Sequence, residues 1–147
     1  MTLGSVREIL DDVRDPEIPA LSITDLGIVR DVHYAGETLE VVLTPTYSGC
    51  PATQVIRDDV ESALRARGIE HLRVVTQLSP AWTTDWISER GRARLHEAGI
   101  APPDAAVLCP RCGSPYTREM ARFGSTPCKA LYRCDACREP FEHVKPH

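Results

Sequence analysis

Four of the six cysteines fall into two Cys-x-x-Cys pairs, Cys109-Pro-Arg-Cys112 and Cys134-Asp-Ala-Cys137, with twenty-one residues between them. Two intervening residues let the chain form a tight knuckle that presents both sulfurs to one ion, and two such knuckles complete a tetrahedron. Gly113, directly after the first pair, suits the positive-φ position that such a knuckle needs. The spacing therefore predicts that Cys109, Cys112, Cys134 and Cys137 hold a structural zinc ion in a zinc ribbon.

Other occupants of the same four thiolates stay open at this point. A rubredoxin-like iron site uses this ligand set for electron transfer, and an iron–sulfur cluster also takes four cysteines. Disulfides are disfavoured, because nothing at the N-terminus resembles an export signal and cytosolic thiols normally stay reduced. No apolar run approaches the roughly 20 residues of a membrane span. We therefore expect a cytoplasmic protein without a membrane partner.

Cys50 lies in the sequence Gly49-Cys50-Pro51, in front of a helical pattern. Proline favours the first helical position, so Cys50 is expected at the N-cap, where backbone donors and the helix dipole lower the pKa of a thiol. Such a thiol can be a nucleophile or a metal ligand. The alternative is a small, inert, buried side chain, and the residues alone leave both interpretations open.

The spacing of apolar residues predicts which elements position these cysteines. Ser5 and Glu8 have the spacing of a capping box and predict the start of a first helix. Alternating and helical periodicities predict the other elements. The expected elements are a helix over 5–13, a hairpin of strands at 28–34 and 39–44, a helix over 51–67, a strand over 72–78 and a helix from Asp85 to Gly99. The fold class is thus α+β, with a small α-β-β-α-β-α domain followed by the ribbon.

The chain of 147 residues has room for one ordinary domain and one small, metal-stabilised domain. Pro102-Pro103 indicates a linker, so we expect a domain over 1–100, a linker over 101–106 and a ribbon over 107–147. Residues 1–106 carry ten Arg and no Lys against seventeen acidic residues, a charge of −7, whereas 107–147 carry +3. The ribbon is the basic end, but the acidic chain as a whole makes nucleic acid an unlikely partner.

Several segments of the first domain together resemble the α+β domain of iron–sulfur assembly factors. This family includes SufT-type proteins and the targeting subunit of the cytosolic iron–sulfur assembly machinery, and the likeness covers about residues 5–100. The matching segments are Asp15-Pro16-Glu17-Ile18-Pro19, Asp25-Leu26-Gly27-Ile28-Val29, Thr44-Pro45-Thr46 with Gly49-Cys50-Pro51, and Trp82-Thr83-Thr84-Asp85. The ribbon, with Phe123-Gly124-Ser125-Thr126-Pro127-Cys128, is similar to the tail of the family of D subunits of bacterial phenylacetyl-CoA epoxidase (PaaD or PaaJ).

The resemblance implies an accessory factor in phenylacetate degradation that matures the epoxidase and does not catalyse its reaction. It implies that Cys50 transiently holds iron or an iron–sulfur cluster destined for a partner subunit, with the reductase subunit favoured over the di-iron subunit. Because one cysteine is too few, the second ligand would come from a homodimer or from Cys128. Asp15 and Thr46 match family positions that would shape the Cys50 pocket.

Two other functions remain as alternatives. A rubredoxin-like electron carrier would hold iron in the four-cysteine site and would be coloured, because ferric tetrathiolate absorbs visible light and zinc does not. A nucleic-acid-binding ribbon that regulates the pathway would lose affinity steeply with added salt. A hydrolase or transferase has little support, because no histidine stands at a motif spacing from a serine or cysteine.

Overall fold

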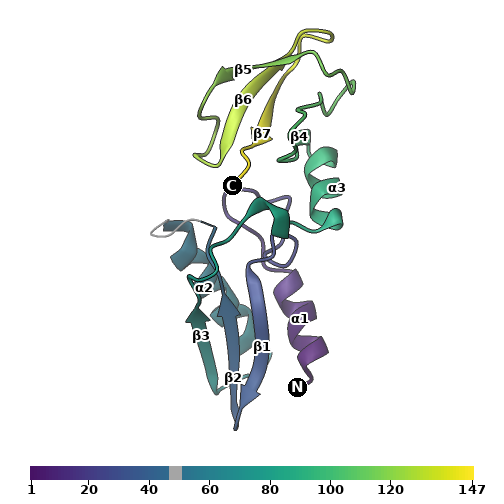
Figure 1. Ribbon diagram of the computed structural model, residues 1–147. Helices are drawn as coiled ribbons and strands as arrows, with labels where there is room; N and C mark the ends of the chain where they lie inside the picture. Colours follow the sequence, from purple (N-terminus) through teal and green to yellow (C-terminus); the bar gives the residue numbers. More distant parts are fainter. Residues whose placement is uncertain (47–50) are drawn as a thin grey trace. The chain divides into compact units, whose positions relative to one another are not determined.

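The structure, a computed structural model, describes residues 1–46 and 51–147 and divides into two compact units, Met1–Ser88 and Glu89–His147 (Figure 1). The first unit contains α1 (Leu3–Asp11), β1 (Val29–Ala35), β2 (Thr38–Leu43), α2 (Pro51–Arg65), β3 (Leu72–Thr76) and the 3₁₀ turn η1 (Thr84–Trp86). The second contains α3 (Glu89–Glu97), β4 (Ile100–Ala101), β5 (Thr117–Ala121), β6 (Lys129–Cys134) and β7 (Pro140–Val144). The predicted α+β class and the predicted element order are confirmed. No helix in the described ranges is long and apolar enough to cross a membrane.

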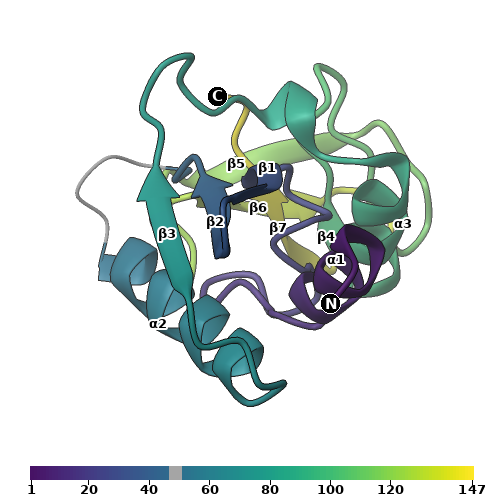
Figure 2. The same ribbon diagram turned by 90° about the horizontal axis from the view of Figure 1, so that it is seen from below.

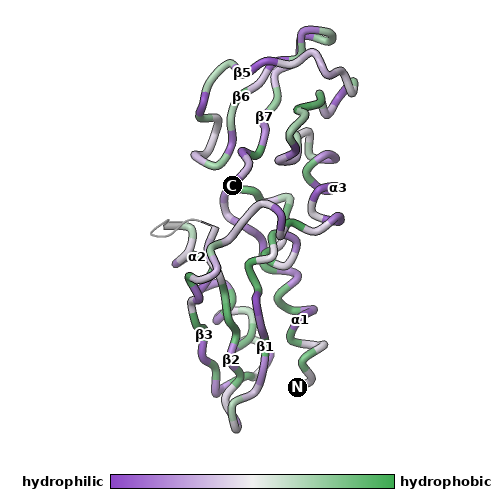
Figure 3. Tube along the Cα trace, in the orientation of Figure 1, coloured by the Kyte–Doolittle hydropathy of each residue, from purple (hydrophilic) through white to green (hydrophobic). Residues whose placement is uncertain are grey.

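The first unit is built on a three-stranded sheet with β2 in the middle. β2 pairs antiparallel with β1 and parallel with β3. Every second side chain of β2 is buried, namely Leu39, Val41 and Leu43, as the alternating pattern predicts. Figures 1 and 2 show α1 and α2 against the same face of this sheet, and Figure 3 shows β2 as a largely hydrophobic strand. The core of the unit therefore lies between one sheet face and two helices.

The first helix begins earlier than expected. Thr2, not Ser5, is the N-cap, because its side-chain oxygen accepts a hydrogen bond from the backbone N–H of Ser5 at 3.1 Å. Serine and threonine hydroxyls can both cap a helix, so the sequence pattern did not distinguish Thr2 from Ser5 as the N-cap. The buried face of the helix follows the predicted spacing, with Val6 and Leu10 fully buried.

The helix predicted to run from Asp85 to Gly99 is wrong in its first turn, residues 85–88. The chain forms only the short turn η1 there, and Ile87 has extended backbone angles (φ −66°, ψ 126°). The next backbone N–H, that of Ser88, donates to the carbonyl of Asp25 at 2.9 Å instead of to a helical carbonyl. A tertiary hydrogen bond therefore overrides the local helical pattern, and α3 begins at Glu89. The third strand also ends early, at Thr76, which leaves Leu78 exposed.

The second unit is a four-stranded sheet in the order β4-β7-β6-β5. β7, β6 and β5 are antiparallel neighbours, whereas β4 runs parallel to β7 and pairs Ala101 with His143. Because β4 directly follows α3, this unit includes α3 and the segment Pro102-Pro103. The division after Ser88 differs from the expected linker at 101–106. The prediction that residues 1–100 and 107–147 are independently folding domains stays a prediction.

Candidate functional site

The two Cys-x-x-Cys pairs come together in the second unit. The Sγ atoms of Cys109, Cys112, Cys134 and Cys137 all lie within 4.8 Å of one another. The Sγ atoms of Cys109 and Cys137 are 3.7 Å apart, and those of Cys112 and Cys134 are 3.5 Å apart. A tetrahedral zinc ion with Zn–S bonds of about 2.3 Å requires sulfurs about 3.8 Å apart. The donor set therefore fits a four-thiolate metal site, and zinc bound there would supply structural cross-linking without redox chemistry.

The first knuckle precedes β5 and is closed by backbone hydrogen bonds. The N–H of Cys109 donates to the carbonyl of Ser114 at 3.0 Å, and the N–H of Gly113 donates back to the carbonyl of Cys109 at 2.8 Å. Gly113 has φ +78°, as its position after the pair predicts. The chain can turn sharply there because glycine has no Cβ. Both sulfurs consequently face the same side of the turn.

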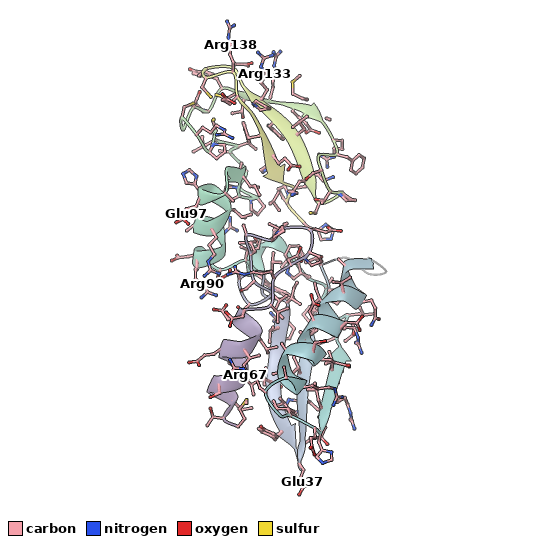
Figure 4. All side chains as sticks on the ribbon, turned by 180° about the vertical axis from the view of Figure 1, so that it is seen from behind. Glu37, Arg67, Arg90, Glu97, Arg133 and Arg138 are labelled. Atoms are coloured by element: carbon pink, nitrogen blue, oxygen red, sulfur yellow. The ribbon has the colours of Figure 1, made fainter. Side chains whose placement is uncertain are left out.

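The second knuckle lies between β6 and β7 and repeats this hydrogen-bond pattern. The N–H of Cys134 donates to the carbonyl of Glu139 at 3.0 Å, and that of Arg138 donates to the carbonyl of Cys134 at 2.9 Å. Arg138 occupies the left-handed position with φ +66°, which costs a non-glycine residue about 1–2 kcal/mol. Its side chain extends from the end of the unit beside that of Arg133 (Figure 4).

The backbone around Cys134 prepares its sulfur to ionise. The N–H of Cys137 lies 3.4 Å from the Sγ of Cys134 and, against the effect of burial, lowers the pKa of this thiol to about 6. The N–H of Ala136 acts in the same direction. Hydrogen-bond donors stabilise the thiolate, which is the form that binds a metal.

The four-sulfur cluster also forms part of the small core of the second unit. Cys109 and Cys134 are buried together with Ala101 and Phe141, and Val107 and Tyr132 pack against them. Cys112 and Cys137 are exposed. Two cysteines thus take the places of the aliphatic side chains that a larger domain would have here, so a metal bound by them would complete the core.

Cys128 does not belong to the cluster. It is buried just before β6, its Sγ lies 3.1 Å from the Oγ1 of Thr126, and its carbonyl accepts the N–H of Lys145 at 3.0 Å. A fifth cysteine ligand in the ribbon therefore has no support among the described residues. Its partnership with Cys50 remains a prediction, because Cys50 lies outside the described residues.

Thr46 precedes the segment 47–50, which carries Cys50. It is half-buried and lines a small cavity of about 10 Å³, together with Ile28 and Thr76 among others. That volume is close to the least that holds one water molecule.

Asp15 closes the turn of the segment Asp15-Pro16-Glu17-Ile18-Pro19. One of its carboxylate oxygens accepts the backbone N–H groups of Glu17 and Ile18, both at 2.8 Å, and its own N–H donates to the carbonyl of Leu21 at 3.0 Å. The side chain is only 5% exposed. Asp15 does not line the cavity beside Thr46. Asp15 therefore stabilises the conformation of this loop through its hydrogen bonds.

We expect Asp15→Ala to lower the free energy of unfolding by about 2–3 kcal/mol, because two N–H groups in a partly buried loop lose a charged acceptor. Asp15→Asn keeps one acceptor oxygen in place and should lose clearly less. Urea denaturation followed by tryptophan fluorescence measures both variants. Equal losses in the two variants would contradict this explanation.

Two of the segments that resemble assembly factors, 25–29 and 82–85, lie side by side. The indole N–H of Trp82 donates to the carbonyl of Leu26 at 2.8 Å, and Trp82 is buried. The N–H of Ser88 binds the carbonyl of Asp25 in the same region. Sequence reasoning did not bring these segments together, because no pattern within either segment points to the other. Each segment carries only a separate signal, Gly27 in the first and Trp82 in the second, and both are residue types that suit tight packing.

The comparisons divide the chain in a similar way. A family model described as an iron–sulfur cluster assembly protein matches residues 4–76, and a model described as the PaaD zinc beta ribbon domain matches residues 96–145. The first match falls within the unit of β1–β3, and the second covers both knuckles.

Individual relatives agree with these models. The putative D subunit of the 1,2-phenylacetyl-CoA epoxidase of Escherichia coli is 50% identical over 93% of this chain and 88% of its own length. The Fe-S protein maturation auxiliary factor YitW of Bacillus subtilis is 33% identical over 58% of this chain and 85% of its own. A crystal structure of a DUF59 domain from Bacillus anthracis matches with a TM-score of 0.57 and 26% identity, over 63% of this chain and 89% of that one.

Proposed function

Because this chain belongs to the family of phenylacetyl-CoA epoxidase D subunits, we propose that it is an accessory factor that helps to mature the epoxidase complex in aerobic phenylacetate degradation. In this proposal the chain is not a catalytic subunit. It assists the insertion of an iron–sulfur cluster, or of the di-iron centre, into a partner subunit. The match of residues 4–76 to iron–sulfur assembly proteins supports this role.

The observation that carries the proposal is the closed four-thiolate cluster. Four protein sulfurs within 4.8 Å of one another fill every position of a tetrahedral metal ion, so no position remains for a substrate. A catalytic zinc site keeps such a position open. In our proposal the ribbon metal is a structural zinc ion, and the transfer of iron needs a different thiol.

Cys50 is the thiol that we assign to this transfer. A single thiolate binds iron or a cluster without closing its coordination sphere, which permits release to a partner. The second ligand would come from Cys50 of another copy or from Cys128. The partners are other epoxidase subunits, with the reductase subunit favoured, and a cytoplasmic location would keep these thiols reduced.

A rubredoxin-like electron carrier is the second candidate, and the exposure of Cys112 and Cys137 favours it. Two sulfurs at the surface would bring a bound iron close to a redox partner. The four-thiolate geometry suits iron as well as zinc. The metal itself separates the two functions, because only the iron form is red.

The decisive measurement is anaerobic metal and acid-labile sulfide analysis, with a visible spectrum, of wild type and Cys50→Ser purified with the epoxidase subunits. We expect about one colourless zinc per chain in both proteins. We expect iron or sulfide only in wild type, and a several-fold loss of epoxidase activity with Cys50→Ser.

Two other results would change the proposal. If neither protein binds iron and Cys50→Ser still yields active epoxidase, the carrier role fails and only docking remains. If wild type is red and the colour depends on the four ribbon cysteines, electron transfer replaces maturation. Cys128→Ser separates the two sources of the second ligand, because it removes the cysteine that lies outside the cluster in the described part of the chain.

A further inference from the structure

The second unit contains an open groove of about 600 Å³ that the proposed function has not used. Its floor includes the apolar side chains of Leu131 and Phe141, from β6 and β7. Phe123, in the loop between β5 and β6, forms part of the wall, and Arg111 of the first knuckle also lines it. All of its lining residues lie between 98 and 142, so the groove belongs to one unit. Its size is within the usual range of ligand sites.

Hydrogen bonds to Glu142 and Lys129 anchor the loop that carries Phe123. The carboxylate of Glu142 accepts the backbone N–H of Ser125 at 2.7 Å and its hydroxyl at 2.8 Å. The N–H of Gly124 donates to the carbonyl of Lys129 at 2.7 Å. A Cβ on Gly124 would collide with the Glu142 carboxylate, so the loop lies directly on this side chain.

Phe123 is 65% exposed, on a loop whose backbone is anchored by these hydrogen bonds. The Lys145 ammonium lies 4.1 Å from the centre of its ring and donates to the carbonyl of Arg122 at 3.1 Å. An exposed aromatic ring that is already held in place costs little conformational entropy when a partner covers it. Rigid aromatic anchors of this kind carry much of the binding energy in protein interfaces.

The charges around the groove include an arginine without an ion pair. Lys129 pairs with Glu142 at 3.7 Å, and Arg118 pairs with Asp135 at 3.2 Å. Arg111 is exposed and forms no ion pair within residues 1–46 and 51–147. Its guanidinium lies beside Gly99, just after α3, where a Cβ added to the glycine would be 4.0 Å from it. The group that complements the positive charge of Arg111 is a carboxylate.

We propose that this groove binds an extended, acidic segment of another epoxidase subunit. An apolar side chain of that segment packs between Phe123 and the floor of Leu131 and Phe141, and an Asp or Glu next to it pairs with Arg111. The identity of the partner protein rests on the proposed function. The chemistry of the segment rests on the exposed aromatic ring of Phe123 and on the unpaired charge of Arg111. The +3 charge of residues 107–147 favours the same acidic occupant.

The test compares two pairs of variants in the full-length protein with its metal bound. Phe123→Ser and Arg111→Glu alter the groove. Tyr116→Ser and Arg138→Glu are the matched controls, because Tyr116 is 72% exposed outside the groove and Arg138 follows the other knuckle. Affinity for each purified epoxidase subunit is measured by biolayer interferometry, and metal content is measured in every variant.

We expect both groove variants to weaken binding to one subunit by about tenfold or more while both controls keep wild-type affinity. Arg111→Glu should also flatten the salt dependence of binding. The proposal is overturned if no subunit binds wild type, if all four variants weaken binding equally, or if neither groove variant does. Binding of a small molecule in the groove, with subunit affinity unchanged in both groove variants, would also overturn it.

The proposed function fails separately from this proposal. Its readout is the iron and sulfide content of the subunits when the whole chain is omitted. Groove-dependent binding with normal iron content would leave the docking site in place and refute maturation. Normal maturation by Phe123→Ser and Arg111→Glu proteins with unchanged affinity would refute the groove and leave maturation in place.

Discussion

Replacing Cys134 with Ser is expected to abolish metal binding and to unfold the second unit, while Met1–Ser88 stays folded. The sulfur is fully buried, lies 3.5 Å from the Sγ of Cys112 and accepts the N–H of Cys137. Zinc binding to a site of this type is worth about 10–16 kcal/mol near pH 7, and it is coupled to folding. The apolar core around the cluster is too small to compensate for such a loss.

Metal analysis combined with limited proteolysis measures both parts of this prediction. Proteolysis should remove the ribbon and leave a resistant N-terminal fragment. Cys128→Ser is the control, because Cys128 is also buried in the second unit but lies outside the cluster, and it should keep one metal ion. A Cys134→Ser protein that retains a full equivalent of metal would show that the four-sulfur site is not the binding site.

Gly27→Ala is expected to destabilise the first unit by about 3 kcal/mol or more. Gly27 has φ +76°, and a Cβ there would lie 2.6 Å from the carbonyl oxygen of Trp86 and 2.8 Å from its Cβ. The backbone cannot easily move away, because the neighbouring carbonyl of Leu26 accepts the indole N–H of Trp82. Strain and overpacking therefore act together.

Gly36→Ala separates these two effects. Gly36 also has a positive φ, +64°, but nothing lies within 4 Å of its Cβ position. Its substitution should cost only about 1 kcal/mol of backbone strain. Urea denaturation followed by fluorescence suits both variants, since both tryptophans lie in the first unit. A similar loss in both variants would mean that contact with Trp86 contributes nothing.

The sequence predicted the parts of this structure that depend on local spacing. Alternation in β2 and the helical spacing in α1 predicted these elements correctly, and the spacing of the cysteine pairs predicted that the four sulfurs come together. The predicted helix start at Asp85 was wrong because the backbone N–H of Ser88 donates to the carbonyl of Asp25, far away in the chain. The groove also escaped prediction, because Phe123 and Arg111 come together only through the pairing of strands. Cys50 remains a sequence-based hypothesis.

The alternation of buried and exposed sulfurs in the two knuckles has a consequence for chemical damage. Each knuckle contributes one buried sulfur, of Cys109 or Cys134, and one exposed sulfur, of Cys112 or Cys137. An alkylating or oxidising reagent therefore meets one sulfur of each knuckle before it reaches either buried one. Electrophilic attack on Cys112 and Cys137 would remove one ligand from each knuckle, and each half of the ribbon would keep one buried, reduced sulfur for the metal.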